Sequence, residues 1–227
     1  MSTHDDEPDG AHTHVLLLRG VNIGGRNRTP KAELAALAER AGAREVTVYL
    51  NSGNVLCRMP DEDASATAEI AERLRRLLAE RLGVDTSVHV AAREELSGLL
   101  DVLAGSELCG ADEGLDELDP KRVHLVLFGR APDADAAAAL QEPSFQAESF
   151  GPDRCLVAGR GVWIRYAAES RSSRLTLPRL ERLLSGRGQG ADSGPDLIGT
   201  ARNLRTVRVL AGRPEPKIDL PSLPPLA

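Results

Sequence analysis

The stretch HVLLLRGVNIGGRNRTPKAELAALAERAGAREVTVYLNSGNVLCR, residues 14–58, decides the fold of this 227-residue chain. It opens with a short apolar run that Gly20 ends, a pattern typical of a buried strand. Pro30 then begins a segment with leucine and alanine at helical spacing, and Gly42 ends that segment. The stretch therefore predicts a strand, a long loop and a helix in that order.

A hairpin and a second helix complete the first unit. The β-rich runs 46–50 and 54–58 flank Asn51-Ser52-Gly53, whose Asn and Gly accept the positive φ of a tight turn. Residues 64–82 carry one apolar helical stripe, and residues 86–90 favour a last strand. The resulting order, β-α-β-β-α-β, is that of a ferredoxin-like unit.

The second half of the chain resembles the first in element order, without a visible residue-level repeat. We expect a strand at 122–128, a helix at 133–140, strands at 154–157 and 162–166, and helices at 177–184 and 201–210. The sequence thus predicts an α+β protein of two ferredoxin-like α/β lobes with a C-terminal helix.

The predicted boundaries follow changes in composition. We expect a disordered acidic leader, an N-terminal lobe that includes a linker helix at 92–103, an acidic inter-lobe connection, a C-terminal α/β lobe with a Gly-rich loop at 186–198, and a Pro-rich tail. In the same order, these segments are residues 1–12, 13–104, 105–120, 121–212 and 213–227.

Composition and charge exclude several classes of protein. The net charge of −6 gives no global positive field that would draw the chain to nucleic acid or to an anionic membrane. Cys57, Cys109 and Cys155 are far apart and form no C-x-x-C pair, so neither a disulfide framework nor a thiolate zinc site is expected. With no signal peptide and no apolar stretch of about 18 residues, the sequence predicts a soluble, cytoplasmic protein.

The loop at 19–30, RGVNIGGRNRTP, is the most distinctive segment. Its glycines let backbone N–H groups approach a ligand, and the following helix start favours an anion. Arginine side chains would add charge-assisted hydrogen bonds. The glycine spacing is neither that of a dinucleotide fingerprint nor that of a P-loop. The alternative is a tight loop in which the asparagines only cap and the glycines only turn.

A second segment, residues 200–206, also combines arginine with asparagine. Thr200 is expected to cap a helix, with Arg202, Arg205 and Thr206 on one basic face. A solvated helix face is the alternative interpretation. We expect the two segments to lie together and to form one electropositive pocket.

Several of these motifs together resemble the bacterial family called domain of unknown function 1697. The resemblance lies in the Arg19-Gly20-x-Asn22-x-Gly24-Gly25 loop, the helix start at Pro30, the Ser52-Gly53-Asn54 hairpin, the run Ser173-Arg174-Leu175-Thr176 and the run from Thr200 to Val207. It covers about residues 13–211. The chain departs from the family pattern at Asn51, Ala201, Leu204 and Arg205. The resemblance implies two ferredoxin-like lobes and no established activity.

Three functions stay open at this point. The first is binding of a small anionic or nucleotide-like ligand at the lobe interface. The second is binding of RNA, which the acidic charge and the absence of RNP aromatic residues oppose. The third is an enzyme that stabilises developing charge with arginine and backbone amides. The predicted ligand contacts are Arg19, Gly20, Asn22, Gly24, Gly25, Arg26, Asn27, Asn54, Arg174, Thr200, Arg202 and Asn203.

Other chemistry has little support in the sequence. His89 and His124 fall in predicted strands, where a neutral histidine with satisfied hydrogen bonds is the common state. No set of His, Asp and Glu has metal-ligand spacing, so neither a metal nor a cofactor is expected. Cys57 and Cys155 are expected to be packed thiols and not nucleophiles.

Overall fold

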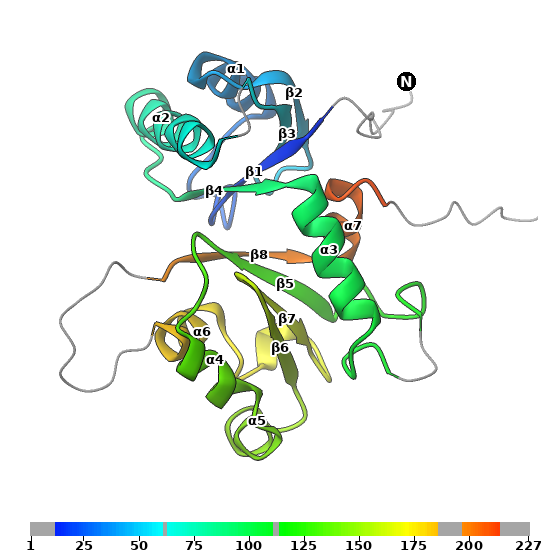
Figure 1. Cartoon of the computed structure of the whole chain (residues 1–227). Helices are drawn as coiled ribbons and strands as arrows, with labels where there is room; N and C mark the ends of the chain where they lie inside the picture. Colours follow the sequence, from blue (N-terminus) through cyan, green and yellow to red (C-terminus); the bar gives the residue numbers. More distant parts are fainter. Residues whose placement is uncertain (1–11, 61–62, 111–113, 186–196, 214–227) are drawn as a thin grey trace, which may run out of the picture.

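The computed structural model describes residues 12–60, 63–110, 114–185 and 197–213. In this part of the chain, two four-stranded antiparallel sheets and seven α-helices form an α+β fold (Figure 1). The predictions for residues 1–11, for the Gly-rich segment 186–196 and for the tail from 214 lie outside the described residues.

The first sheet has the order β2-β3-β1-β4. Its strands and helices follow one another as β-α-β-β-α-β. They are β1 (His14–Leu18), α1 (Lys31–Ala41), β2 (Arg44–Tyr49), β3 (Asn54–Arg58), α2 (Ala64–Leu82) and β4 (Val88–Ala92). We call these elements the N-terminal lobe.

The second sheet has the corresponding order, β6-β7-β5-β8. Its elements are β5 (Val123–Phe128), α4 (Ala134–Gln141), α5 (Pro143–Phe150), β6 (Arg154–Ala158), β7 (Gly161–Arg165), the 3-10 turn η1 (Ser170–Ser172), α6 (Leu177–Leu184) and β8 (Gly199–Asn203). We call these the C-terminal lobe. One further helix follows the last strand of each sheet: α3 (Arg93–Ala104) after β4 and α7 (Leu204–Leu210) after β8.

The two sheets face one another, and helices cover their outer faces (Figure 1). Helices α1 and α2 bury leucine and isoleucine side chains against the outer face of the first sheet, and α4, α5 and α6 cover that of the second. Between the sheets lies one apolar cluster to which both lobes, α3 and α7 contribute. Its centre is Trp163, whose indole N–H donates to the carbonyl oxygen of Leu99 in α3 at 2.8 Å.

Local chemistry explains why the helices begin and end where they do. The Asp63 carboxylate accepts the backbone N–H of Ser65 at the start of α2, and Gly83 ends that helix in the left-handed conformation. Gly42 ends α1 in the same way. These signals are visible in the sequence, and the predicted bounds of α2 agree with the structure.

One prediction of secondary structure was wrong at a place that matters for the site. Residues 199–203 form strand β8 instead of the start of a helix, and the helix begins only at Leu204. Thr200 therefore caps nothing. The cap is Asn203, whose side-chain oxygen accepts the N–H of Thr206 at 2.9 Å. Helix α5 was not predicted at all.

Candidate functional site

The interface between the two sheets contains polar side chains at one end, in addition to the apolar cluster. Strand side chains alternate between faces, so Arg19, which follows β1, continues the face of Val15 and Leu17 toward the second sheet. The same alternation turns Thr200 and Arg202 of β8 toward the first sheet, in register with Leu127 and Leu125. Two arginines from different lobes therefore enter the same interface.

Arg202 connects the two lobes, and all of its guanidinium N–H groups are hydrogen-bonded. Its Nε–H donates to Asn54 Oδ1 at 2.5 Å, and Nη2 donates to the carbonyl oxygens of Leu18 and Ser52 at 2.8 and 2.9 Å. Nη1 donates to the hydroxyl of Thr200 and to the carbonyl of Ala201. Every one of the five guanidinium N–H groups has an acceptor.

Burial gives this contact its character. Arg202 is 9% exposed, and burial lowers its pKa to about 10. The Thr200 hydroxyl donates to the carbonyl of Leu18 at 3.3 Å, which adds a second polar link between the lobes. The structure thus gives Arg202, Asn54 and Thr200 an inter-lobe structural role, with no donor of Arg202 left for a ligand.

Arg19 is more open. Its guanidinium forms an ion pair with Glu181 of α6 and donates to the carbonyl of Gly199 at 3.2 Å. The side chain is 31% exposed and that of Glu181 is 17% exposed. Glu181 also accepts the N–H of Gly199 at 2.9 Å. These bonds use three of the five guanidinium N–H groups of Arg19, and two remain for a further acceptor.

The glycine-rich loop is shaped by its own side chains. The amide of Asn22 donates to the carbonyls of Thr29 and Asn51 at 3.1 and 2.7 Å and accepts the N–H of Thr29. The side chain of Asn27 donates to the carbonyl of Gly20 at 3.1 Å. Both asparagines have positive φ, as do Gly24 and Gly25 at the exposed tip. These contacts give the asparagines the turn-forming role of the alternative interpretation, and they fix the loop beside the hairpin.

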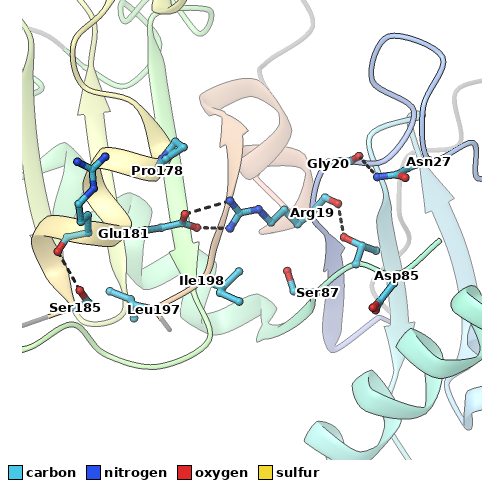
Figure 2. Close-up of a pocket in the computed structure, with 12 residues that line it drawn as sticks. Arg19, Gly20, Asn27, Asp85, Ser87, Pro178, Glu181, Ser185, Leu197 and Ile198 are labelled. Atoms are coloured by element: carbon cyan, nitrogen blue, oxygen red, sulfur yellow. Dashed lines mark hydrogen bonds and ion pairs between the residues drawn. The ribbon is translucent and has the colours of Figure 1, made fainter. Parts of the chain in front are cut away.

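A cavity of about 580 Å³ opens between the lobes next to Arg19 (Figure 2). The N-terminal lobe contributes the loop start and the segment before β4, and the C-terminal lobe contributes α6 and the segment before β8. The lining residues are Arg19, Gly20, Asn27, Asp85, Thr86, Ser87, Pro178, Glu181, Arg182, Ser185, Leu197 and Ile198.

Two arginines and two carboxylates line this cavity, but they do not form two pairs with one another. Asp85 pairs with Arg75 at 2.5 Å, and Glu181 pairs with Arg19. Arg182 is exposed, and its guanidinium has no partner among the described residues. The positive charge that is not neutralised in the cavity wall therefore belongs to Arg182.

Two polar atoms near this cavity lack a hydrogen-bond partner within the described part of the chain: Ser87 Oγ and His89 Nε2. His89 lies on the edge strand β4 and Ser87 lies directly before it, two residues away, so both face the interface. His89 is 6% exposed. Burial, together with the charges of Arg160, Arg19 and Arg202, lowers its pKa to about 4. His89 is therefore neutral near pH 7, as expected, but its Nε2 has no hydrogen-bond partner among the described residues, contrary to the expectation from the sequence.

A second cavity, of about 460 Å³, shares Ser87 with the first as a lining residue. His89 and Val90 of β4, Gly129 and Arg160 of the C-terminal lobe and the alanine face of α2 line it. Arg160 makes an ion pair with Glu95 at 2.6 Å and donates to the carbonyls of Val90 and Phe128. Because Ser87 belongs to both walls, the two cavities are neighbours.

The predicted contact residues separate into groups. Arg19, Gly20 and Asn27 line the first cavity, whereas Asn54, Thr200 and Arg202 form the buried inter-lobe network. Asn22, Gly24, Gly25 and Arg26 shape the loop. Arg174 is exposed and Asn203 caps α7, and neither lines an inter-lobe cavity.

Sequence reasoning missed Ser87, His89, Glu181 and Arg182. The two-residue spacing of Ser87 and His89 at the start of β4 was the available signal, but every strand has residues at that spacing. Among the described residues, no three His, Cys, Asp or Glu side chains are placed to hold a metal ion. No helix in the described ranges has the length and apolar character needed to cross a membrane. Cys57 and Cys155 are buried, as expected, and burial raises the pKa of each thiol to about 12.

Comparison with known proteins gives a family but no activity. The structure is similar to that of the conserved bacterial protein SP0830 from Streptococcus pneumoniae, with a TM-score of 0.60 and 20% sequence identity over 88% of this chain and 97% of that one. At this identity the likeness shows a shared fold. No curated protein matches the sequence. A family model described as "Protein of unknown function (DUF1697)" matches residues 11–163, and the chain therefore belongs to that family.

Proposed function

We propose that the first inter-lobe cavity binds a small anionic ligand, with Arg182 and the free N–H groups of Arg19 as its charged contacts. The observation that carries this proposal is the pairing of charges in the wall. Both carboxylates are already held by arginines, Asp85 by Arg75 and Glu181 by Arg19, while Arg182 has no partner in the described ranges. An incoming carboxylate or phosphate would complete that set.

The surroundings of the cavity support an anion and not a cation. The charges of Arg160, Arg19 and Arg202 all act to lower the pKa of His89, so the interface carries a local positive field although the whole chain is acidic. Partly enclosed sites weaken such a field less than open water does. This field favours a small anion over a metal ion or an amine.

The two other functions fit the contacts less well. RNA-binding sheets present an open face to the bases, but here helices cover both outer faces and the inner faces cover each other. Acyl or phosphoryl transfer by a serine would need a base bonded to its hydroxyl, whereas Ser87 Oγ and His89 Nε2 have no partner among the described groups. A binding role is therefore preferred to catalysis.

We also propose that the two lobes are versions of one ferredoxin-like unit and that the protein is cytoplasmic. The shared strand order of the two sheets, and the helix that follows each of them, support two versions of one ferredoxin-like unit. Cys57, Cys109 and Cys155 are buried and form no disulfide in the described part of the chain, which suits a cytoplasmic protein.

A thermal-shift titration with inorganic phosphate, citrate and nucleoside monophosphates tests the proposal, since a ligand that binds only the native state raises the melting temperature. For whichever anion stabilises the wild type, we expect Arg182→Gln to lower the binding affinity about tenfold, as for loss of one charged hydrogen bond. Arg171→Gln is the matched control, because Arg171 is also exposed but lines neither inter-lobe cavity. The proposal fails if no anion stabilises the wild type, or if both variants respond like the wild type.

A further inference from the structure

The two neighbouring cavities differ in the kind of group that each one lacks. The first has a charged group, Arg182, that lacks a partner among the described residues. In the second, the charged side chains are paired: Arg160 with Glu95, and Arg75 with Glu72 and Asp85. In the part of the chain that the structure describes, the atoms of the second cavity that lack a hydrogen-bond partner are neutral: Ser87 Oγ and His89 Nε2.

From this difference we infer that the two cavities are subsites of one ligand, whose anionic group lies by Arg19 and Arg182 and whose neutral heterocycle lies by Ser87 and His89. A nucleoside monophosphate has this chemistry. The inference rests on the proposed function, because it assumes an anion in the first cavity, and it adds the class of molecule that carries that anion.

The walls of the second cavity suit a flat heterocycle. One wall is the face of α2, where Ala64, Ala68 and Ala71 offer apolar contact next to the ion-paired side chains of Glu72 and Arg75. Opposite, Gly129 keeps the backbone open beside His89, whose Nδ1 lies 3.6 Å from the position that a Cβ at Gly129 would occupy. An apolar wall beside a few polar atoms is the usual composition of a site for a heterocyclic ligand.

The polar atoms match the edge of such a ring. A neutral imidazole presents one donor and one acceptor nitrogen, and a serine hydroxyl serves as either. Buried polar atoms without partners carry a desolvation penalty, so a ring edge that satisfies Ser87 and His89 removes a penalty already present in the free protein.

Isothermal titration of the full chain with three kinds of probe tests the inference. The probes are inorganic phosphate, the uncharged nucleosides, and the nucleoside monophosphates. We expect at least one nucleoside monophosphate to bind about tenfold or more tightly than phosphate or its own nucleoside, since each satisfied neutral hydrogen bond contributes up to about a factor of ten.

Ser87→Ala and His89→Leu should each reduce the affinity for that monophosphate several-fold and leave phosphate binding unchanged. Arg182→Gln should weaken both. Ser87→Ala keeps the test decisive even if His89→Leu fails to fold, because the lost hydroxyl makes no hydrogen bond with the described residues.

The failures of the two proposals are distinguishable. Phosphate binding that depends on Arg182, with no gain from any nucleoside, would overturn the two-subsite inference alone. Absence of binding for every anion would overturn the proposed function as well. Monophosphate binding that is unaffected by both Ser87→Ala and His89→Leu would also reject the inference.

Discussion

Replacement of Arg202 is the sharpest test of how the lobes are joined. In Arg202→Ala, Asn54 Oδ1 loses its arginine partner in a fully buried position, which costs about 1–3 kcal/mol. Two buried methylene groups, Cγ and Cδ, are lost as well, at about 0.8 kcal/mol each. The carbonyls of Leu18 and Gly53 keep other donors, the Thr200 hydroxyl and the Leu18 N–H. We therefore expect the free energy of unfolding to fall by about 3–5 kcal/mol, within the range for large single-residue effects.

Urea denaturation followed by tryptophan fluorescence measures this loss, because Trp163 is the single tryptophan and lies buried between the sheets. Arg202→Met should recover the part that comes from the methylene groups, about 2 kcal/mol. Arg171→Ala is the exposed control and should change stability by less than about 0.5 kcal/mol. A fully stable Arg202→Ala that has lost ligand binding would refute the structural role and return Arg202 to the ligand site.

Three further predictions concern other groups. The pKa of His89 is lowered to about 4 in the folded protein, so as the pH falls the unfolded chain binds a proton at this residue before the folded chain does. The free energy of unfolding should therefore fall by about 2 kcal/mol from pH 7.5 to 5 in urea titrations. His89→Leu should lose this part of the pH dependence. Cys57 and Cys155, with pKa values raised to about 12 by burial, should react with a thiol reagent at pH 8 only after urea is added; prompt labelling in the native state would contradict their packing. Gly53→Ala should strongly destabilise the fold in thermal melts, because its φ is +73° and a Cβ would lie 2.7 Å from that of Leu18; an unchanged melting temperature would refute this.

The sequence predicted those elements whose signals are local. Leucine spacing and terminal glycines located α1 and α2, and the Asn-Gly turn located the hairpin. Strand β8 was mistaken for a helix because its inward residues, Thr200 and Arg202, are polar and hide the period-two pattern. Helix α5 was missed because few of its residues are apolar.

The site could be predicted only in part, for a physical reason. The loop drew attention through its arginines and glycines, and Arg19 does line a cavity. The ion-pair partner of Arg19, Glu181, is 162 residues away in the sequence, so no local pattern connects them. Whether a guanidinium keeps N–H groups without an acceptor, as Arg19 does, or has all five bonded, as Arg202 does, depends on the packing of two sheets and is not visible in residue type.

The apolar layer between the sheets limits how a gene for such a protein can be divided or recombined. Helix α3 follows the first sheet in the chain, yet the carbonyl of its Leu99 accepts the indole N–H of Trp163 in the second, and leucines of both lobes complete the same cluster. A fragment that ended after Ala104 would leave that surface in water, where it would favour aggregation. The two sheets therefore have to be kept together in recombination. Transfer of a single half into another protein would carry over only part of the apolar cluster between the sheets.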